Sequence, residues 1–182
     1  MGTALQLLVE LDHDAIRATT ELRSSPATAV LALVSAWWVK GPLLVAAGWC
    51  ADLRNGRLFP LVALAATASF ALASWLNALI KALVGRSRPP HEMGLEAIVG
   101  VPGSPSFPSG HAMSAFAVAA AIALLAPRLR WPVLGLAALI GFSRVYLGVH
   151  FWLDVLAGSA LGIAIGALIA VAFRRSLALR LR

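Results

Sequence analysis

Long apolar runs, separated by short polar stretches, dominate the chain. Five of them have the length and continuity of helices that cross or nearly cross a bilayer, which takes about 20 residues. These runs cover residues 27–50, 58–84, 108–126, 131–146 and 151–173. The third and fourth are shorter than a full crossing needs, so we expect their ends to stop below the surface, around a recess. The pattern predicts an all-α fold, an integral membrane helical bundle.

The first 24 residues follow an amphipathic pattern instead. Over residues 3–22, leucines and alanines fall on one side of a helical wheel and polar residues on the other, with Asp12 and Arg23 as exceptions. Such a helix is expected to lie in the membrane interface. The alternative is a short first membrane helix, which would bury Asp12, Asp14 and Glu10 at high cost. The bundle is therefore expected to contain five to six transmembrane helices.

The whole chain, residues 1–182, is expected to form one membrane domain. It consists of the N-terminal helix (1–24), the transmembrane bundle (27–173) and a basic tail (174–182). The only long connection, 85–107, is rich in Gly and Pro and long enough to fold over a site. Lys40, beside Gly41 and Pro42 in the first run, either faces the bundle or extends to the surface. The first residues carry no positive charge, so no cleavable signal peptide is expected.

Composition supports the bilayer as the solvent of this chain. Of its 182 residues, 60% are hydrophobic and 13% are charged, whereas soluble proteins contain about 25% charged residues. The net charge of +7 does not indicate nucleic acid, because the arginines form no basic face interleaved with aromatics. The single cysteine, Cys50, excludes a disulfide framework and is expected to be a small buried residue.

Basic residues outside the motifs sort to one side when the chain is threaded up and down through five spans. This set is Arg54, Arg57, Arg128, Arg130, Arg174, Arg175, Arg180 and Arg182. The positive-inside rule makes that side cytoplasmic. The residues with candidate chemistry fall on the opposite side. We therefore expect a multi-pass plasma membrane protein with an extracytoplasmic active site.

The stretch from Ser143 to Asp154 contains a histidine and a carboxylate four residues apart. If a helix begins near His150, His150 and Asp154 share a face, and the carboxylate can fix the imidazole tautomer. The other ring nitrogen is then free to attack. Arg144 offers a fork of donors suited to phosphate oxygens. Tyr146 and the six tryptophans are typical of residues at the membrane surface.

Two further clusters are expected on the same side. Lys81 and Arg88 are two helical turns apart, ahead of a helix-ending Pro89, and can clamp a dianionic group. Ser109 is a candidate N-cap, and Gly110 permits close backbone approach to an anion at the helix start. His111, in that first turn, is placed to donate a proton to a leaving oxygen.

Together these groups provide what phosphoryl transfer requires: charge neutralisation, a nucleophile with an orienting acid, and a proton donor. The sequence has no acidic cluster of the kind that holds magnesium or calcium. We therefore predict a reaction that uses neither a metal nor a cofactor.

At these residues the chain resembles the type 2 phosphatidic acid phosphatase family. It carries Lys-x6-Arg-Pro from Lys81, Pro-Ser-Gly-His from Pro108, and Ser-Arg-x5-His-x3-Asp from Ser143, in the family's order and spacing. The resemblance implies that His150 forms a phosphohistidine, oriented by Asp154, and that His111 is the general acid. It also implies that Lys81, Arg88 and Arg144 bind the phosphoryl oxygens, assisted by Ser109 and the backbone of Gly110. The family usually has six spans, and here an amphipathic helix stands in place of the first.

The expected function is hydrolysis of a phosphate monoester or diphosphate head group of a membrane lipid. A polyprenyl diphosphate such as the undecaprenyl carrier is the first candidate substrate. Phosphatidylglycerophosphate, phosphatidate and a polyprenyl-phosphoribose phosphate follow. A non-catalytic lipid-binding or transport protein is the alternative, while soluble haloperoxidases of the same fold lack this apolar content. The expected partners are the lipid substrate and the bilayer; the sequence does not determine the oligomeric state.

Overall fold

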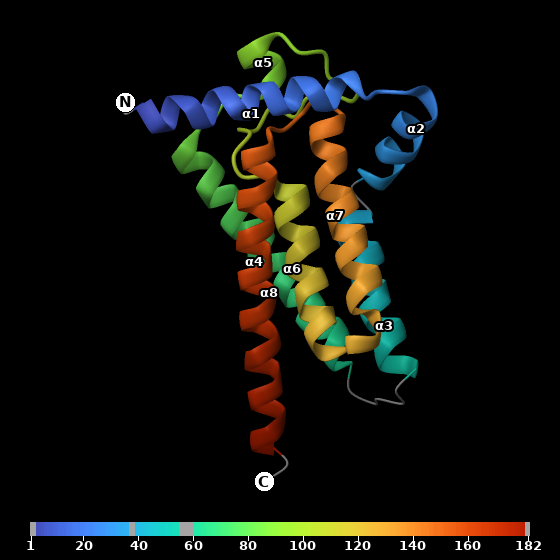
Figure 1. Ribbon diagram of the computed structural model, residues 1–182. Coiled ribbons are helices and arrows are strands. Elements are labelled where there is room, and N and C mark those ends of the chain that lie inside the picture. The colour runs from blue at the N-terminus through green and yellow to red at the C-terminus, as the bar shows by residue number, and fades with distance from the viewer. Residues whose placement is uncertain (1–2, 37–38, 55–59, 181–182) are drawn as a thin grey trace.

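The computed structural model describes residues 3–36, 39–54 and 60–180, and these residues form helices and connecting loops without a strand (Figure 1). The side chains of Lys40 and Arg54 and those of residues 177–180 lie outside the described part, as do Arg57 and Arg182 entirely. In chain order the elements are α1 (Thr3–Glu21), α2 (Ser25–Val34), the π-helix η1 (Val39–Leu43), α3 (Leu44–Arg54), α4 (Leu61–Val84), α5 (Pro89–Met93), α6 (Gly110–Leu125), the 3-10 helix η2 (Pro127–Leu129), α7 (Arg130–Tyr146) and α8 (Trp152–Arg180). The predicted all-α class is confirmed.

Helix α6 is the centre of the bundle, and α4, α7 and α8 pack around it. Twelve of its 16 residues are buried, most of them alanines. Among the described helices, two regions are long and apolar enough to cross a bilayer, Leu61–Met93 and Trp152–Ser176. As the sequence predicted, α6 and α7 are shorter, with 16 and 17 residues.

Glycines bring α6 and α8 into direct backbone contact. Gly158, Gly162 and Gly166 recur every fourth residue on α8 and face α6. A Cβ at Gly158 would lie 2.7 Å from the carbonyl oxygen of Ser109, and one at Gly162 would lie 2.3 Å from that of Met113. Small residues at this spacing allow close helix packing in a bilayer. The start of α6 is therefore fixed beside the start of α8.

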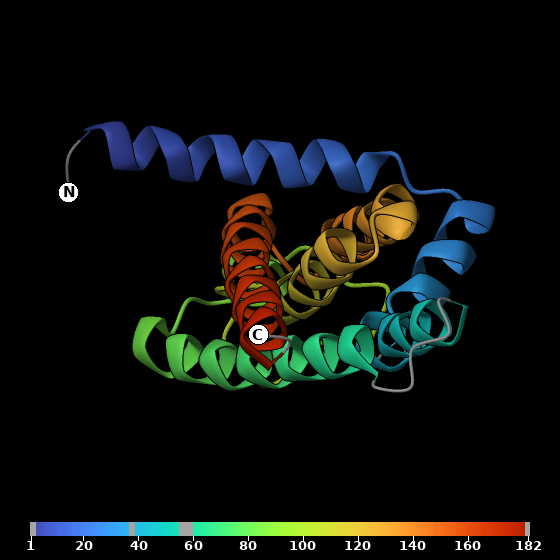
Figure 2. The same ribbon diagram turned by 90° about the horizontal axis from the view of Figure 1, so that it is seen from below.

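Helix α1 lies crosswise at one end of the bundle, along the side formed by α7 and α8 and opposite α4 (Figures 1 and 2). Its inward stripe is Asp12, Ile16 and Thr19, all buried. The exposed leucines of this helix are Leu5, Leu7, Leu8 and Leu11. The indole N–H of Trp152 donates to the Thr19 hydroxyl at 3.0 Å, which ties α1 to the start of α8.

The first predicted span is divided rather than continuous. It consists of α2, the π-helix η1 and α3, and Pro42 lies inside the π-helix. Proline has no N–H to donate and clashes with the preceding turn, which accounts for the interruption. Two other boundaries differ from expectation. The connection 85–107 contains the short helix α5, and α8 continues to Arg180, so the basic tail expected at 174–182 is largely helical.

Two single residues also differ from their predicted surroundings. Cys50 is exposed, not buried. It lines an apolar hollow of about 320 Å³ together with residues of η1, α3, η2 and α7. Cys50 is therefore exposed among other apolar side chains on the outer face of α3. Tyr146, expected at the membrane surface, is only 2% exposed. Its hydroxyl accepts a hydrogen bond from the Ser24 backbone N–H at 2.8 Å and so ties the α1–α2 junction to α7.

Candidate active site

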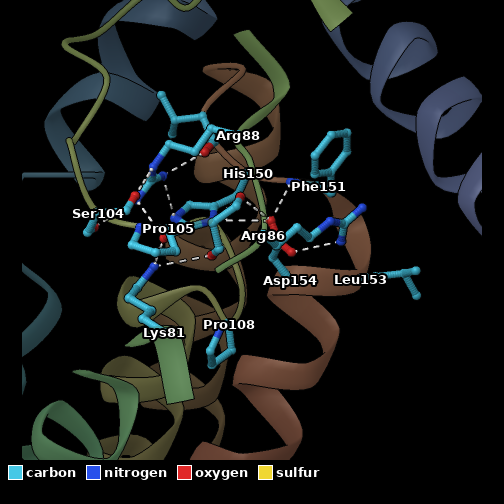
Figure 3. Close-up of polar contacts among 12 residues, drawn as sticks. Lys81, Arg86, Arg88, Ser104, Pro105, Pro108, His150, Phe151, Leu153 and Asp154 are labelled. Carbon is cyan, nitrogen blue, oxygen red and sulfur yellow. Dashed lines mark hydrogen bonds and ion pairs between the residues drawn. The ribbon is translucent and has the colours of Figure 1, made fainter. Parts of the chain in front are cut away.

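His150 lies in the tight turn between α7 and α8, and α8 begins two residues after it. Gly148 has a φ of 78°, and the Val149 N–H donates to the Arg144 carbonyl at 3.1 Å, which reverses the chain here. His150 therefore precedes the helix instead of starting it. Its ring nevertheless faces Asp154, with 3.4 Å between Nδ1 and Oδ2, as the i, i+4 spacing predicted (Figure 3).

The hydrogen bonds around His150 define its tautomer. The Arg88 guanidinium donates to Nε2 at 3.1 Å, so Nε2 is the acceptor and Nδ1 carries the hydrogen. Nδ1 lies 3.3 Å from the Ser106 hydroxyl as well as facing Asp154. Burial lowers the pKa of His150 from 6.5 to about 3, opposed by the hydrogen bond with Asp154 and reinforced by the charges of Arg88 and Arg144. The ring is therefore neutral near pH 7, with a lone pair on Nε2.

Asp154 is fully buried in the first turn of α8, and several donors hold its carboxylate. Oδ2 accepts hydrogen bonds from the Ser106 hydroxyl and, at 3.0 Å, from the Phe151 backbone N–H. Oδ1 accepts from the Arg86 guanidinium at 2.8 Å. Such a carboxylate can stabilise positive charge that develops on the imidazole.

Arg88 and Lys81 fasten the loop 94–109 over the site (Figure 3). The Arg88 side chain, 3% exposed, donates to the Ser104 carbonyl at 2.8 Å and to the Val149 carbonyl at 2.8 Å. The Lys81 ammonium donates to the carbonyls of Pro105 and Ser106. Both cations are thus directed at the same side of the bundle as the His150 ring.

The remaining predicted phosphate ligands lie at the ends of α6 and α7. Ser109 occupies the N-cap position of α6, but its hydroxyl makes no capping bond. Within the described residues, the Ser109 Oγ and the Arg144 Nε are buried polar atoms without a hydrogen-bond partner. Gly110 packs against Asn77, where a Cβ would lie 2.8 Å from the amide oxygen.

His111 is the second residue of α6 and is half-buried. The Ser109 N–H donates to the backbone carbonyl of Asp154 at 3.0 Å, so the N-cap of α6 is bonded directly to the first turn of α8. This contact connects the segment that carries His111 to the one that carries Asp154. The role of His111 as general acid stays a prediction.

Three residues near the site had no predicted role. Arg86 lies inside the Lys-x6-Arg-Pro motif and bridges two carboxylates, those of Asp154 and Asp12. Ser106 bonds Asp154 from the covering loop. Asp12 belongs to α1, and its only signal in the sequence was its departure from the amphipathic pattern.

The site is at the end of the bundle opposite the C-terminus (Figure 1). Arg128, Arg130, Arg174 and Arg175 are exposed at or toward that other end. This is the separation of charges that the threading of the chain predicted. In the described part of the chain, no three His, Cys, Asp or Glu side chains gather as metal ligands.

The chain is similar to known proteins in sequence and in fold. Residues 62–177 match the PAP2 superfamily. The chain belongs to this family. The resemblance drawn from the three motifs is thereby confirmed, and the matched region contains every predicted site residue.

Among curated relatives, the lipid A 1-phosphatase of Rhizobium johnstonii is 39% identical over 102 residues, which are 53% of this chain and 42% of that protein. The decaprenylphosphoryl-5-phosphoribose phosphatase of Mycobacterium tuberculosis is 42% identical over 106 residues, 58% of each chain. The similarity to these relatives thus spans about half of their length.

The fold is also that of a solved membrane protein. The crystal structure of the transmembrane PAP2 type phosphatidylglycerolphosphate phosphatase from Bacillus subtilis superposes with a TM-score of 0.77 and 28% identity, over 96% of this chain and 88% of that one. The likeness therefore includes the N-terminal part of the chain as well as the matched region.

Proposed function

We propose that this protein is an integral membrane lipid phosphatase that works through a phosphohistidine. The observation that carries the proposal is the state of His150. Its neutral ring presents the Nε2 lone pair to a guanidinium, while Nδ1–H faces a buried carboxylate. A positively charged neighbour attracts a phosphoryl group to this nitrogen, and the carboxylate stabilises the imidazole as it gains charge.

In the proposed reaction, His150 Nε2 attacks phosphorus and the bond from phosphorus to the leaving oxygen breaks. His111 donates a proton to that oxygen. Water, deprotonated by His111, then attacks the phosphohistidine and releases inorganic phosphate and a neutral His150. Lys81, Arg88, Arg144, Ser109 and the Gly110 N–H hold the phosphoryl oxygens. The unpartnered buried Ser109 Oγ and Arg144 Nε support this assignment.

A membrane lipid is the proposed substrate class. Leucines of α1 are exposed beside the site, as expected of a helix in the membrane interface. A hollow of about 180 Å³ beside Arg88 is lined by Arg86, Ser87, His91 and Ser104 among others. It is smaller than the roughly 300–1,000 Å³ of sites for drug-sized molecules, which favours a compact head group. We infer a polyprenyl diphosphate first, then phosphatidylglycerophosphate, phosphatidate or a polyprenyl-phosphoribose phosphate.

We further propose five to six spans in the plasma membrane, with the site on the extracytoplasmic side. The exposed arginines of η2, α7 and α8 support this orientation through the positive-inside rule. The test is a cysteine at Glu96, in the loop over the site, with Cys50 replaced by serine. A membrane-impermeant maleimide should label it in intact cells. Labelling only after lysis would reverse the orientation.

The activity is tested by phosphate release from each of these lipids by purified protein in mixed micelles. The wild-type protein should turn over at least one lipid with or without a chelator, and His150→Ala should reduce release to background. When the reaction with a 32P-labelled lipid is quenched, the wild-type protein should carry 32P in a bond that is sensitive to acid and stable to base, as expected of a phosphohistidine. Equal release by wild type and variant would reject the mechanism. Lipid binding without release would favour a binding or transport protein.

A further inference from the structure

A continuous chain of polar contacts leads from α1 to the His150 ring. The Arg86 guanidinium donates through one nitrogen to Asp12 Oδ2 at 2.9 Å and through the other to Asp154 Oδ1 at 2.8 Å. Asp154 in turn faces the His150 Nδ1. Arg86 also lies over the Phe151 ring, 4.1 Å from its centroid. Segments far apart in the sequence thus meet in one charged group beside the nucleophile.

Asp12 is the buried carboxylate of a helix whose other acidic residues face outward. Its residue exposure is 4%, whereas Glu10, Asp14 and Glu21 are exposed. Burying a carboxylate costs several kcal/mol unless its oxygens are bonded. Both oxygens are used here, because Oδ1 accepts the Leu153 backbone N–H at 3.0 Å. Asp12 therefore caps the first turn of α8 at the residue next to Asp154.

The charges of this group matter for catalysis. Arg86 alone would neutralise Asp154, leaving little negative charge to balance a phosphorylated imidazole. With Asp12, the two carboxylates and one guanidinium sum to one negative charge. The other charged or titratable groups around His150 and Phe151 come from several elements: Arg88 before α5, Arg144 of α7, Lys81 of α4, and His13 of α1, whose ring stacks on Phe151.

We propose that Asp12 is a positioning residue for the His150–Asp154 pair. Through Arg86 it preserves the negative charge of Asp154, and through the Leu153 N–H it fixes the backbone that carries this carboxylate. Helix α1 thereby contributes a residue to the working site. The inference rests on the proposed function for its kinetic test.

The kinetic test compares Asp12→Asn with Asp14→Asn, the same change on an exposed position of the same helix. For Asp12→Asn we expect kcat per folded protein to fall about tenfold, as for other partners that orient a catalytic group, with KM little changed. Asp14→Asn should match wild type. The double variant Asp12→Asn/Arg86→Gln loses one negative and one positive charge, so the net charge of the group stays as in wild type. Its kcat should be at least that of Asp12→Asn.

A second readout does not depend on turnover. In protein labelled with 15N-histidine, the Nδ1 proton of His150 is assigned by its absence in His150→Ala. Its chemical shift should move upfield in Asp12→Asn and downfield in Arg86→Gln, and it should return toward the wild-type value in the double variant. If Asp12→Asn does not fold, the other two variants still test these directions.

The proposal is overturned if Asp12→Asn keeps the wild-type kcat and proton shift, or if its only effect is a lower folded fraction. An unmoved proton in Arg86→Gln also overturns it. If wild-type protein releases no phosphate from any lipid, the proposed function fails, and the proton shifts still decide the role of Asp12.

Discussion

Arginine side chains are buried at one end of the helical bundle and exposed toward the other. At the site end, Arg88 and Arg144 are 3% and 5% exposed. Toward the other end, Arg128, Arg130, Arg174 and Arg175 are exposed. An exposed arginine needs little from its neighbours, whereas a buried one must be matched by carbonyls, carboxylates or a ligand. Basic residues alone therefore do not mark the site, whereas buried basic residues with directed hydrogen bonds do.

The largest effect is expected for Arg88→Lys, which tests whether a buried arginine is needed for its hydrogen bonds as well as for its charge. Lysine keeps the charge but cannot donate at once to Ser104, Val149 and His150 as the guanidinium does. We expect phosphate release to fall by about 10²–10³-fold, the scale for losing one preorganised donor to the transition state. Arg130→Lys, at the other end, is the matched control and should retain wild-type turnover. Near-normal turnover in Arg88→Lys would mean that charge alone suffices.

Acid should destabilise the site end through His150. Its folded pKa is about 3, below the ordinary 6.5. Between these values the unfolded chain binds a proton that the folded site excludes, so stability falls as pH drops from about 6.5 toward 3, by at most about 1.4 kcal/mol per pH unit. Thermal unfolding in detergent should show this slope in wild type and a shallower one in His150→Gln. Parallel slopes would contradict the assignment.

A pair of glycine substitutions compares the packing of the two ends. Gly158→Ala would place a Cβ 2.7 Å from the Ser109 carbonyl, whereas a Cβ at Gly135, near the start of α7, meets nothing within 4 Å. We expect Gly158→Ala to destabilise the protein by about 1–3 kcal/mol through overpacking and to reduce activity. Gly135→Ala should stabilise by up to about 1 kcal/mol. Unfolding midpoints measure both, and equal shifts would show that the two ends pack alike.

The smallest effect is expected for Arg128→Gln. This arginine is exposed in η2, and surface changes of this kind stay within about 0.5 kcal/mol. Unfolding and phosphate release should both match wild type. A loss of activity without a loss of stability would indicate that the arginine-rich end takes part in the reaction.

Much of the fold was predictable because long apolar runs leave few alternatives. The bounds of α1, α4, α6 and α7 follow the pattern of the sequence closely. The division of the first span was less predictable. A proline in an apolar run can kink a helix, as many membrane helices show, or divide it, and the neighbouring helices decide which.

Some contacts of the candidate site were also predictable from the sequence, and others were not. Motif spacing brought His150, Asp154 and Arg88 together correctly, because these contacts are local or lie at helix ends that meet. The contacts of Asp12 with Arg86 and Leu153 span 74 and 141 residues, and no local periodicity contains them. The one clue was a charge on the wrong side of an amphipathic wheel, which we interpreted as an exception although it marked the inward face of α1.

The glycine contact between α6 and α8 has a consequence for how the protein can diverge. A side chain can change rotamer, whereas two backbones in direct contact can hardly move relative to each other. The distance between the N-terminal ends of α6 and α8 is therefore set by the main chain. The residues of α8 that face away from α6, such as Leu156 and Leu168, contribute nothing to that distance. They are free to adapt to bilayers of different thickness or fluidity while the dimensions of the reaction centre stay constant.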